Sequence, residues 1–430
     1  MVINKKLLDK SFLDNMLIFL FFDIIVIFPL FNRLESLNIG IGLINALQIY
    51  VLIFTSLFLF LNKNFKNIIE IIKEIKPFAY YAIYIFFSLT IYFLFSNLSV
   101  VNYFREIFYS ILPLSMLLLG IGLNKYQRKL YLKTIIYSIF FLSIFTLLAS
   151  FNVIKSDFYN SIFGNNSLNF SGLYGPIIYG YISQLCISIL FLYPEKLFSK
   201  IIKYSLISYF FIICVLTLQR APLIGLMLTL LIVILKNFKN FYFNKDNIFK
   251  LTVLILSLSI IIIFIAILIP TSFYLYKIDF LNIDIFRIKI ILDELTNFSL
   301  KEVLEGRVNQ AIIFSDAVFY DFFGMGFGRF SKLNDFNIAF AQPDASYYRL
   351  FNEIGFIGLV TFFYSHLSNL FKDKITLNYL FRFQIIIFTL FAFFFNRILW
   401  TSPCGFLFYF LIGTSISLEN NQNLNFKSKS

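Results

Sequence analysis

Charged residues are scarce in this chain, and their scarcity excludes an ordinary soluble domain. Only 14% of the 430 residues are Asp, Glu, Lys or Arg, while 59% are hydrophobic and the mean hydropathy is +0.82. Soluble domains carry charges at about a quarter of their positions and apolar residues at about half. The composition therefore predicts a polytopic membrane protein.

Cysteine and histidine are also rare, which argues against a disulfide framework or a metal centre. The chain has three cysteines, Cys186, Cys214 and Cys404, all within apolar segments and without CxxC spacing. The single histidine, His366, lies late in an apolar run, where packing is the commoner role, and one histidine cannot form a metal cluster. We therefore expect no metal and no cofactor.

The net charge of +13 raises the question of nucleic-acid binding, which requires basic residues gathered on one soluble face. Here the basic residues are scattered between hydrophobic segments instead. That distribution is typical of a membrane protein, in which basic connections set the orientation. Nucleic acid is excluded as a partner, and membrane lipids are expected.

Apolar stretches long enough, or nearly long enough, to span a bilayer recur along the whole sequence. They predict an all-α protein with about twelve transmembrane helices, forming a single integral membrane domain over residues 1–430. The stretches cover residues 12–31, 38–61, 78–97, 107–123, 134–151, 172–193, 204–219, 221–235, 251–271, 347–370, 383–399 and 403–418.

Basic residues gather in every second connection between these stretches, as expected when those connections are cytoplasmic. The sequence thus predicts a multi-pass protein of the cytoplasmic (inner) membrane with both termini in the cytoplasm. The basic groups lie at residues 5–10, 63–76, 125–133, 196–203, 236–250, 372–382 and 427–429.

The longest connection, residues 272–346, then lies on the outer face, in the periplasm or outside the cell. Backbone that is left unpaired in lipid is costly, so we expect this polar stretch outside the bilayer. Apolar residues at helical spacing predict two amphipathic helices, over residues 284–304 and 307–322. The GMGFG run at 324–328 then breaks the second helix.

Two arginines of the predicted outer side are candidates for holding phosphate. Arg220 lies between two apolar stretches, where it either faces the interior and binds phosphate or extends to the interface as a solvated side chain. Arg307 follows Glu305 and Gly306. Together the two guanidinium groups would supply bidentate donors to a diphosphate, whereas Arg307 alone would be an exposed loop residue.

Two carboxylates near the end of this connection are candidates for a general base. Asp344 falls where the connection meets the membrane, so partial desolvation can raise its pKa into a useful range. It is equally placed to cap the helix that comes next. Glu353 and Arg349 are four residues apart, so they either neutralise each other or line a cavity together with Tyr347.

A glycine-rich stretch from Gly172 to Gly180 precedes Gln184. Small residues let helices approach closely, so close packing is one interpretation of this stretch. The other is a broken helix that lines a cavity, with Gln184 in the lining.

In order and spacing, these features resemble the bacterial O-antigen polymerase and O-antigen ligase superfamily. The resemblance covers about residues 170–365. It rests on five motifs: the glycine-rich entrance at 172–180, Arg220 with Ala221, the EGR box at 305–307, the GxGxG turn at 324–328, and the LxxExGxxG-like stretch from Leu350 to Gly358.

The resemblance implies a GT-C-like membrane fold and a metal-independent, inverting glycosyl transfer at the outer face. Arg220 and Arg307 would grip the diphosphate of an undecaprenyl-linked oligosaccharide, and Asp344, or otherwise Glu353, would act as the base. Ligases of this superfamily have histidine then asparagine where this chain has Asp344 and Ala345, which favours a polymerase.

The implied reaction moves the growing glycan from its undecaprenyl diphosphate carrier onto another lipid-linked repeat unit. A chain-length regulator and a flippase are the implied protein partners. Three alternatives remain open at this point: a ligase that uses lipid A core or a protein as acceptor, a flippase for lipid-linked oligosaccharides, and a noncatalytic scaffold.

Overall fold

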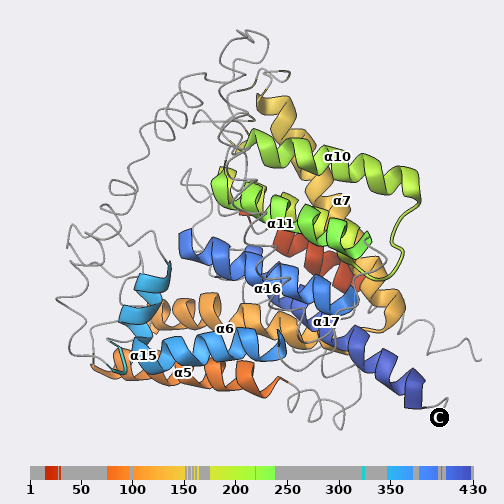
Figure 1. Ribbon diagram of the computed structural model, residues 1–430. Coiled ribbons are helices and arrows are strands. Elements are labelled where there is room, and N and C mark those ends of the chain that lie inside the picture. The colour runs from red at the N-terminus through yellow and green to blue at the C-terminus, as the bar shows by residue number, and fades with distance from the viewer. Residues whose placement is uncertain are drawn as a thin grey trace, which may run out of the picture. The chain divides into compact units, whose positions relative to one another are not determined.

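The structure is a computed structural model of residues 1–430 (Figure 1). It describes the placement of ten stretches of the chain and a few single residues. They are residues 15–27, 29–30, 75–95, 100–150, 175–217, 219–237, 322–324, 346–370, 377–395 and 403–427, with 153, 156, 159, 162, 163 and 399.

The described part of the chain is built of helices and contains no strand, which confirms the all-α prediction. Every predicted apolar stretch coincides with a helix except 38–61 and 251–271, which lie outside the described residues. The helices are α5 (Lys76–Phe95), α6 (Val100–Gly122), α7 (Lys125–Ser150), α9 (Pro176–Leu192), α10 (Lys200–Leu216), α11 (Arg220–Asn237), α15 (Ser346–Leu367), α16 (Leu377–Phe395) and α17 (Cys404–Lys427), with a helical segment at Asn15–Ile27 and a short 3-10 turn at Ser368–Leu370.

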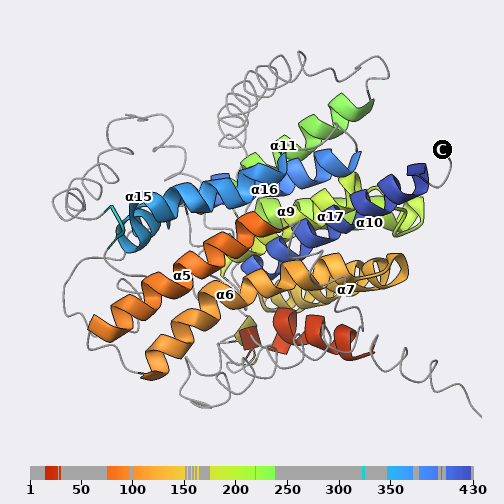
Figure 2. The ribbon, with the colours of Figure 1, turned by 90° about the horizontal axis from the view of Figure 1, so that it is seen from below.

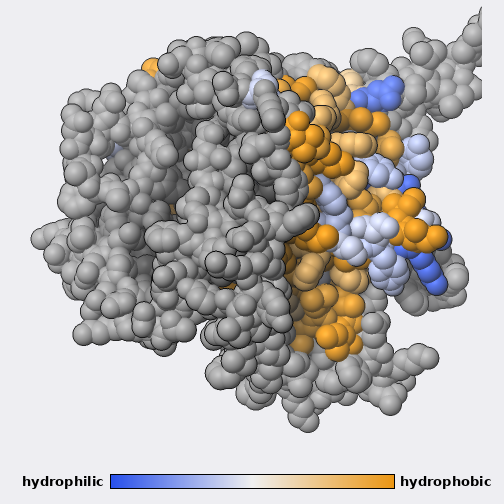
Figure 3. All heavy atoms as spheres, turned by 90° about the horizontal axis from the view of Figure 1, so that it is seen from above, coloured by the Kyte–Doolittle hydropathy of each residue, from blue (hydrophilic) through white to orange (hydrophobic). Residues whose placement is uncertain are grey.

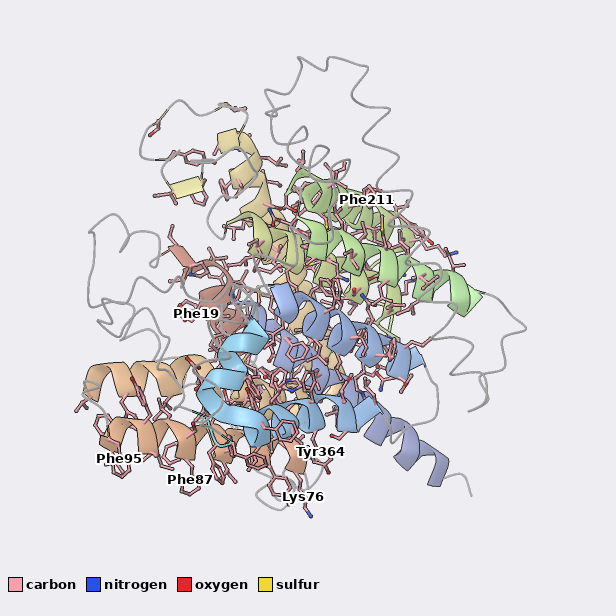
Figure 4. The ribbon with its side chains drawn as sticks, turned by 60° about the vertical axis from the view of Figure 1, so that its left-hand side comes forward. Phe19, Lys76, Phe87, Phe95, Phe211 and Tyr364 are labelled. Carbon is pink, nitrogen blue, oxygen red and sulfur yellow. The ribbon has the colours of Figure 1, made fainter. Side chains whose placement is uncertain are left out.

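Two of these helices are long and apolar enough to cross a membrane: α5, and the part of α7 from Lys125 to Ala149. Shorter apolar helical segments, of 10 to 17 residues, account for most of the remainder. Beyond Lys76, its first residue, α5 exposes aromatic and aliphatic side chains, and Figure 4 shows Phe87 and Phe95 pointing away from the protein. That exposure suits a lipid-facing surface.

The chain divides into two compact units, residues 1–139 with 313–430, and residues 140–312, which we describe separately. In the first unit α6 packs along α17, and α5 lies beside α6 (Figure 2). The α6–α17 contact is close because Gly120 faces Gly413: a Cβ added at Gly413 would meet the Leu117 carbonyl and lie 3.1 Å from the Gly120 Cα. Small residues at a crossing allow such an approach between helices.

In the second unit α9 packs against both α10 and α11. The apolar side chains of α10 include exposed Ile201, Phe211 and Ile212. Figure 3 shows apolar areas, interspersed with hydrophilic ones, where described residues reach the surface in that view. A helix that is apolar on its outer side is typical of a protein surrounded by lipid.

Helix α7 begins nine residues earlier than its apolar stretch predicts. Asn124 and Gln127 form a reciprocal capping box: the Gln127 N–H donates to Asn124 Oδ1 (2.9 Å) and the Asn124 N–H donates to Gln127 Oε1 (3.2 Å). Arg128, which the sequence places in a solvated connection, is instead buried and donates to the Leu123 carbonyl (2.8 Å) and to Ser417 Oγ (2.6 Å).

Candidate functional site

Helix α15 is broken in its middle at Gly355. The backbone there has φ 65° and ψ −169°, outside the helical region and inside the range that favours glycine. The first part of α15 turns away from α5, whereas the second part runs beside α5 (Figures 1 and 4). The apolar pattern predicted one continuous helix over 347–370, so the break is a feature that hydropathy alone missed.

A break inside a helix leaves carbonyls and N–H groups that need partners outside the helix. At this break α5 supplies hydroxyl donors: Tyr84 donates to the Ile354 carbonyl (2.7 Å) and Ser88 approaches the Glu353 carbonyl (3.5 Å). On the other side of the break, the Ile357 N–H donates to the carbonyl of Phe322 (3.4 Å). Each side of the break therefore has a hydrogen-bond partner outside the helix.

The segment Phe322–Gly324 reaches this break from far away in the sequence. Gly324 has φ 82° and lies against Gly355, which has φ 65°. A Cβ on Gly324 would meet the Gly355 nitrogen, and a Cβ on Gly355 would meet the Gly324 nitrogen. Backbone lies against backbone, so only glycine fits on either side.

Gly358 is the remaining glycine of this stretch. A Cβ at Gly358 would meet the Ile354 side chain and lie 2.6 Å from Cε1 of Tyr84, so these two side chains occupy the space that a larger residue would need. The GxGxG turn and the LxxExGxxG-like stretch, two motifs of the family resemblance, are in direct contact through Gly324 and Gly355.

Glu353 carries the acidic side chain of this site, and it is completely buried. The phenol of Tyr81, which is also buried on α5, lies within electrostatic range of the Glu353 carboxylate. Its position beside the break makes it a candidate for a general base. Among the predicted catalytic residues, Glu353 is the one whose side chain the structure describes.

His366 lies further along α15, in an aromatic cage. Its Nδ1 is 2.7 Å from the Phe362 carbonyl, which places the proton on Nδ1, and its Nε2 then accepts from the Tyr409 hydroxyl (3.1 Å). The rings of Phe78 and Tyr81 lie at 5.3 and 5.9 Å. Packing and hydrogen bonding between α15, α5 and α17 account for this histidine.

The side chains of the predicted phosphate-binding residues are not among those described. Arg220 is the first residue of α11 and comes after α10 and a short turn, as the sequence predicted, but only its backbone is described. Tyr347 and Arg349 are placed in the first turn of α15, again by backbone alone. Arg307 and Asp344 lie outside the described residues. So do the two predicted amphipathic helices, apart from Phe322, the last residue of the second, which lies in a bend and not in a helix.

Gln184 belongs to a helix–helix contact. It is fully buried on α9, and its Nε2 donates to Ser188 Oγ (3.0 Å), Thr229 Oγ1 (3.0 Å) and the Gly225 carbonyl (3.1 Å). A Cβ on Gly180 would lie 2.7 Å from Pro222 Cγ. At these two residues the structure therefore supports close packing of α9 on α11, the first of the two interpretations of the glycine-rich stretch, in place of a cavity lining.

The sequence did not identify Tyr84 and Ser88. They lie in an apolar run, and no local pattern shows that their hydroxyls bond the carbonyls at the break in α15. Sequence reasoning also passed over Asp23, which is fully buried in a π-helical turn at Asp23–Ile27. Neither carboxylate oxygen of Asp23 has a hydrogen-bond partner within the part of the chain that the structure describes. A lone acid in an apolar run was the available signal.

Comparison with protein-family models, with curated proteins and with solved structures gave no match. The family resemblance therefore depends on the motifs alone.

Proposed function

We propose that this protein is a polytopic glycosyltransferase of the polysaccharide-polymerase kind, with about twelve membrane spans, a GT-C-like fold and cytoplasmic termini. It would transfer a growing glycan from undecaprenyl diphosphate to another lipid-linked repeat unit at the outer face of the cytoplasmic membrane. The observation that carries the proposal is the contact of the Gly324 turn with the Gly355 break, beside the buried Glu353.

That contact supports the proposal because it joins two motifs of the resemblance that are distant in sequence. Contact between Gly324 and Gly355 lets residues of the long connection lie next to a buried carboxylate of α15. A transferase for two lipid-linked substrates needs such an arrangement: a base for the acceptor hydroxyl, near a segment that can carry the donor site.

In the proposed reaction, the acceptor hydroxyl attacks the anomeric carbon of the donor sugar and gives its proton to a carboxylate, Asp344 or Glu353. The bond from that carbon to the diphosphate oxygen breaks, and the electron pair leaves with undecaprenyl diphosphate. Arg220 and Arg307 would stabilise the charge on the departing diphosphate. Tyr347 and Arg349 would line the same site.

A deletion strain complemented with variants tests this proposal by gel analysis of surface polysaccharide. We expect Glu353→Gln and Arg307→Ala to give single repeat units without polymer, the phenotype of a missing polymerase. Glu195→Gln, at the α9–α10 connection, is the matched acid-to-amide control and should support full polymer. Full-length polymer from a well-expressed Arg220→Ala, Arg307→Ala double variant would contradict the proposal.

The same deletion strain distinguishes a polymerase from a ligase. Loss of a ligase leaves no glycan on lipid A core, while carrier-linked polymer still accumulates. A lipid A core acceptor and a protein acceptor are then separated by the fraction in which the glycan is found. Retention of single units on the core in the deletion strain would favour the polymerase.

A flippase is the second candidate, and one observation favours it. Buried titratable groups succeed one another along α15 and its neighbours: Glu353, Tyr81, His366 and Tyr409. Chains of this type serve as proton relays in transporters. If this were the function, His366→Phe would trap carrier-linked units on the cytoplasmic side, whereas a polymerase with His366 in a packing role would still export them.

A further inference from the structure

Tyr84 lies near the middle of α5. Helix α5 runs from Lys76 to Phe95 and qualifies by length and composition as a membrane span. At 1.5 Å per residue, Tyr84 lies about 12 Å from Lys76 and about 16 Å from Phe95 along the helix axis. If α5 crosses the bilayer, Tyr84 is near its middle.

The backbone of Phe322–Gly324 lies at this same level. The Tyr84 hydroxyl is 3.2 Å from the Phe323 carbonyl and 2.7 Å from the Ile354 carbonyl, so its proton is shared between the two. Gly324 meets Gly355, the residue directly after Ile354. Figure 4 shows Lys76 and Phe95 at opposite ends of α5, with Phe87 between them.

Non-helical backbone is tolerated at membrane depth only when its polar groups are satisfied by protein or line a watery cavity. Here the Phe322 carbonyl accepts from the Ile357 N–H, and the Phe323 carbonyl faces the Tyr84 hydroxyl. The protein thus satisfies both carbonyls without water.

The side chains of the segment are those of a lipid-facing surface. Phe322 and Phe323 are 63% and 68% exposed, and the Phe322 ring lies 5.8 Å from that of Phe356, which is 51% exposed. Exposed phenylalanines next to exposed apolar residues of α5 are unfavourable in water and favourable in hydrocarbon.

We propose that Phe322–Gly324 is a re-entrant turn that enters the bilayer from the outer side and reaches about its middle. The connection 272–346, expected to lie wholly outside the membrane, would then be divided by a membrane-inserted turn fixed to α15 at Gly355. This inference depends on α5 crossing the membrane and not on the reaction. Where the proposed glycosyl transfer also holds, the buried Glu353 places acceptor activation within the membrane.

Spin-label depth measurements in lipid vesicles test the turn. In a background with Cys186, Cys214 and Cys404 replaced by Ala, one label is placed by Phe323→Cys. Two reference labels on α5 are placed by Ile83→Cys, next to Tyr84, and by Phe95→Cys, at the outer end; both native side chains are exposed. Accessibility to oxygen and to a water-soluble nickel chelate gives the depth of each label.

We expect the label at 323 to match that at 83 within about one helical turn, roughly 5 Å. A label at 323 that is as shallow as that at 95, or shallower, would overturn the re-entrant turn. The polysaccharide phenotype plays no part in this result, so failure of the proposed function would leave it unchanged.

Tyr84→Phe tests whether the hydroxyl fixes the turn, with Tyr80→Phe as the control one turn earlier on α5. Loss of one hydrogen bond should raise the reaction rate of Phe323→Cys with a membrane-impermeant maleimide roughly three- to tenfold. Tyr80, 54% exposed, should leave the rate unchanged when changed to Phe. Equal rates in the two variants would overturn the role of Tyr84.

Discussion

Two close contacts between helices, one in each compact unit, use glycine and polar groups in different ways. Where α9 meets α11, both helices stay intact, and the Gln184 side chain bonds Ser188 and Thr229 and also the Gly225 carbonyl. Where α15 meets α5, the helix itself is broken, and the polar groups at the contact belong to its backbone. A contact between side chains can adjust to a substitution, whereas one between backbones has little freedom to do so.

Of the substitutions at these two contacts, Gly355→Ala should lower the free energy of unfolding the most. It places a Cβ against the backbone of Gly324 and Phe322 at a positive φ, which alanine adopts only with strain. We expect the free energy of unfolding to fall by about 3 kcal/mol or more. All three cysteines are buried, so a thermal melt monitored by thiol labelling shows this loss as a lower midpoint temperature.

Gly122→Ala is the matched control, because nothing lies within 4 Å of a Cβ built at Gly122. The control should melt with the unmodified protein. If Gly355→Ala also melted at the temperature of the unmodified protein, helix α15 would not be broken at Gly355 and in contact with Gly324 as described.

Gly180→Ala should have a smaller effect, and it sharpens the contrast between the two contacts. The new Cβ would meet Pro222 Cγ at 2.7 Å and Thr217 Oγ1 at 2.8 Å; the threonine side chain can rotate, whereas the proline ring can change only its pucker. We expect a loss of about 1 to 2 kcal/mol, measured in the same melt. A loss as large as that of Gly355→Ala would mean that the α9 contact is as rigid as the broken helix.

The sequence predicts the described helices well because long apolar runs, free of Gly and Pro clusters, favour helices over turns and loops. It predicts their ends less well: the nine-residue extension of α7 depends on Asn124 and Gln127, a capping pair that hydropathy does not detect. In the candidate site, Glu353 and the glycines at 324, 355 and 358 were identified from their motifs. Their contact could not be predicted, because it depends on Tyr84, whose hydroxyl has no local signature.

Gln184→Leu should have a moderate effect: it removes an amide NH2 whose two hydrogens serve three acceptors, but those acceptors keep other partners. Ser188 and Thr229 remain 3.0 Å apart, and Thr229 still donates to the Gly225 carbonyl (2.9 Å). A hydrogen bond contributes about 1 kcal/mol net, so we expect a loss of that order in the thermal melt. An unfolded or unstable product would show that Gln184 supports more than this contact.

The smallest expected effect is the coupling between Gln184 and Thr229, which a double-mutant cycle isolates. Gln184→Leu and Thr229→Val each remove the 3.0 Å contact, so the double variant should be more stable than the sum of the single losses implies, by about 0.6 kcal/mol. The value is small because each partner keeps another hydrogen bond. Strict additivity would show that the two side chains stabilise the α9–α11 contact independently, so that the contact depends mainly on close packing at Gly180.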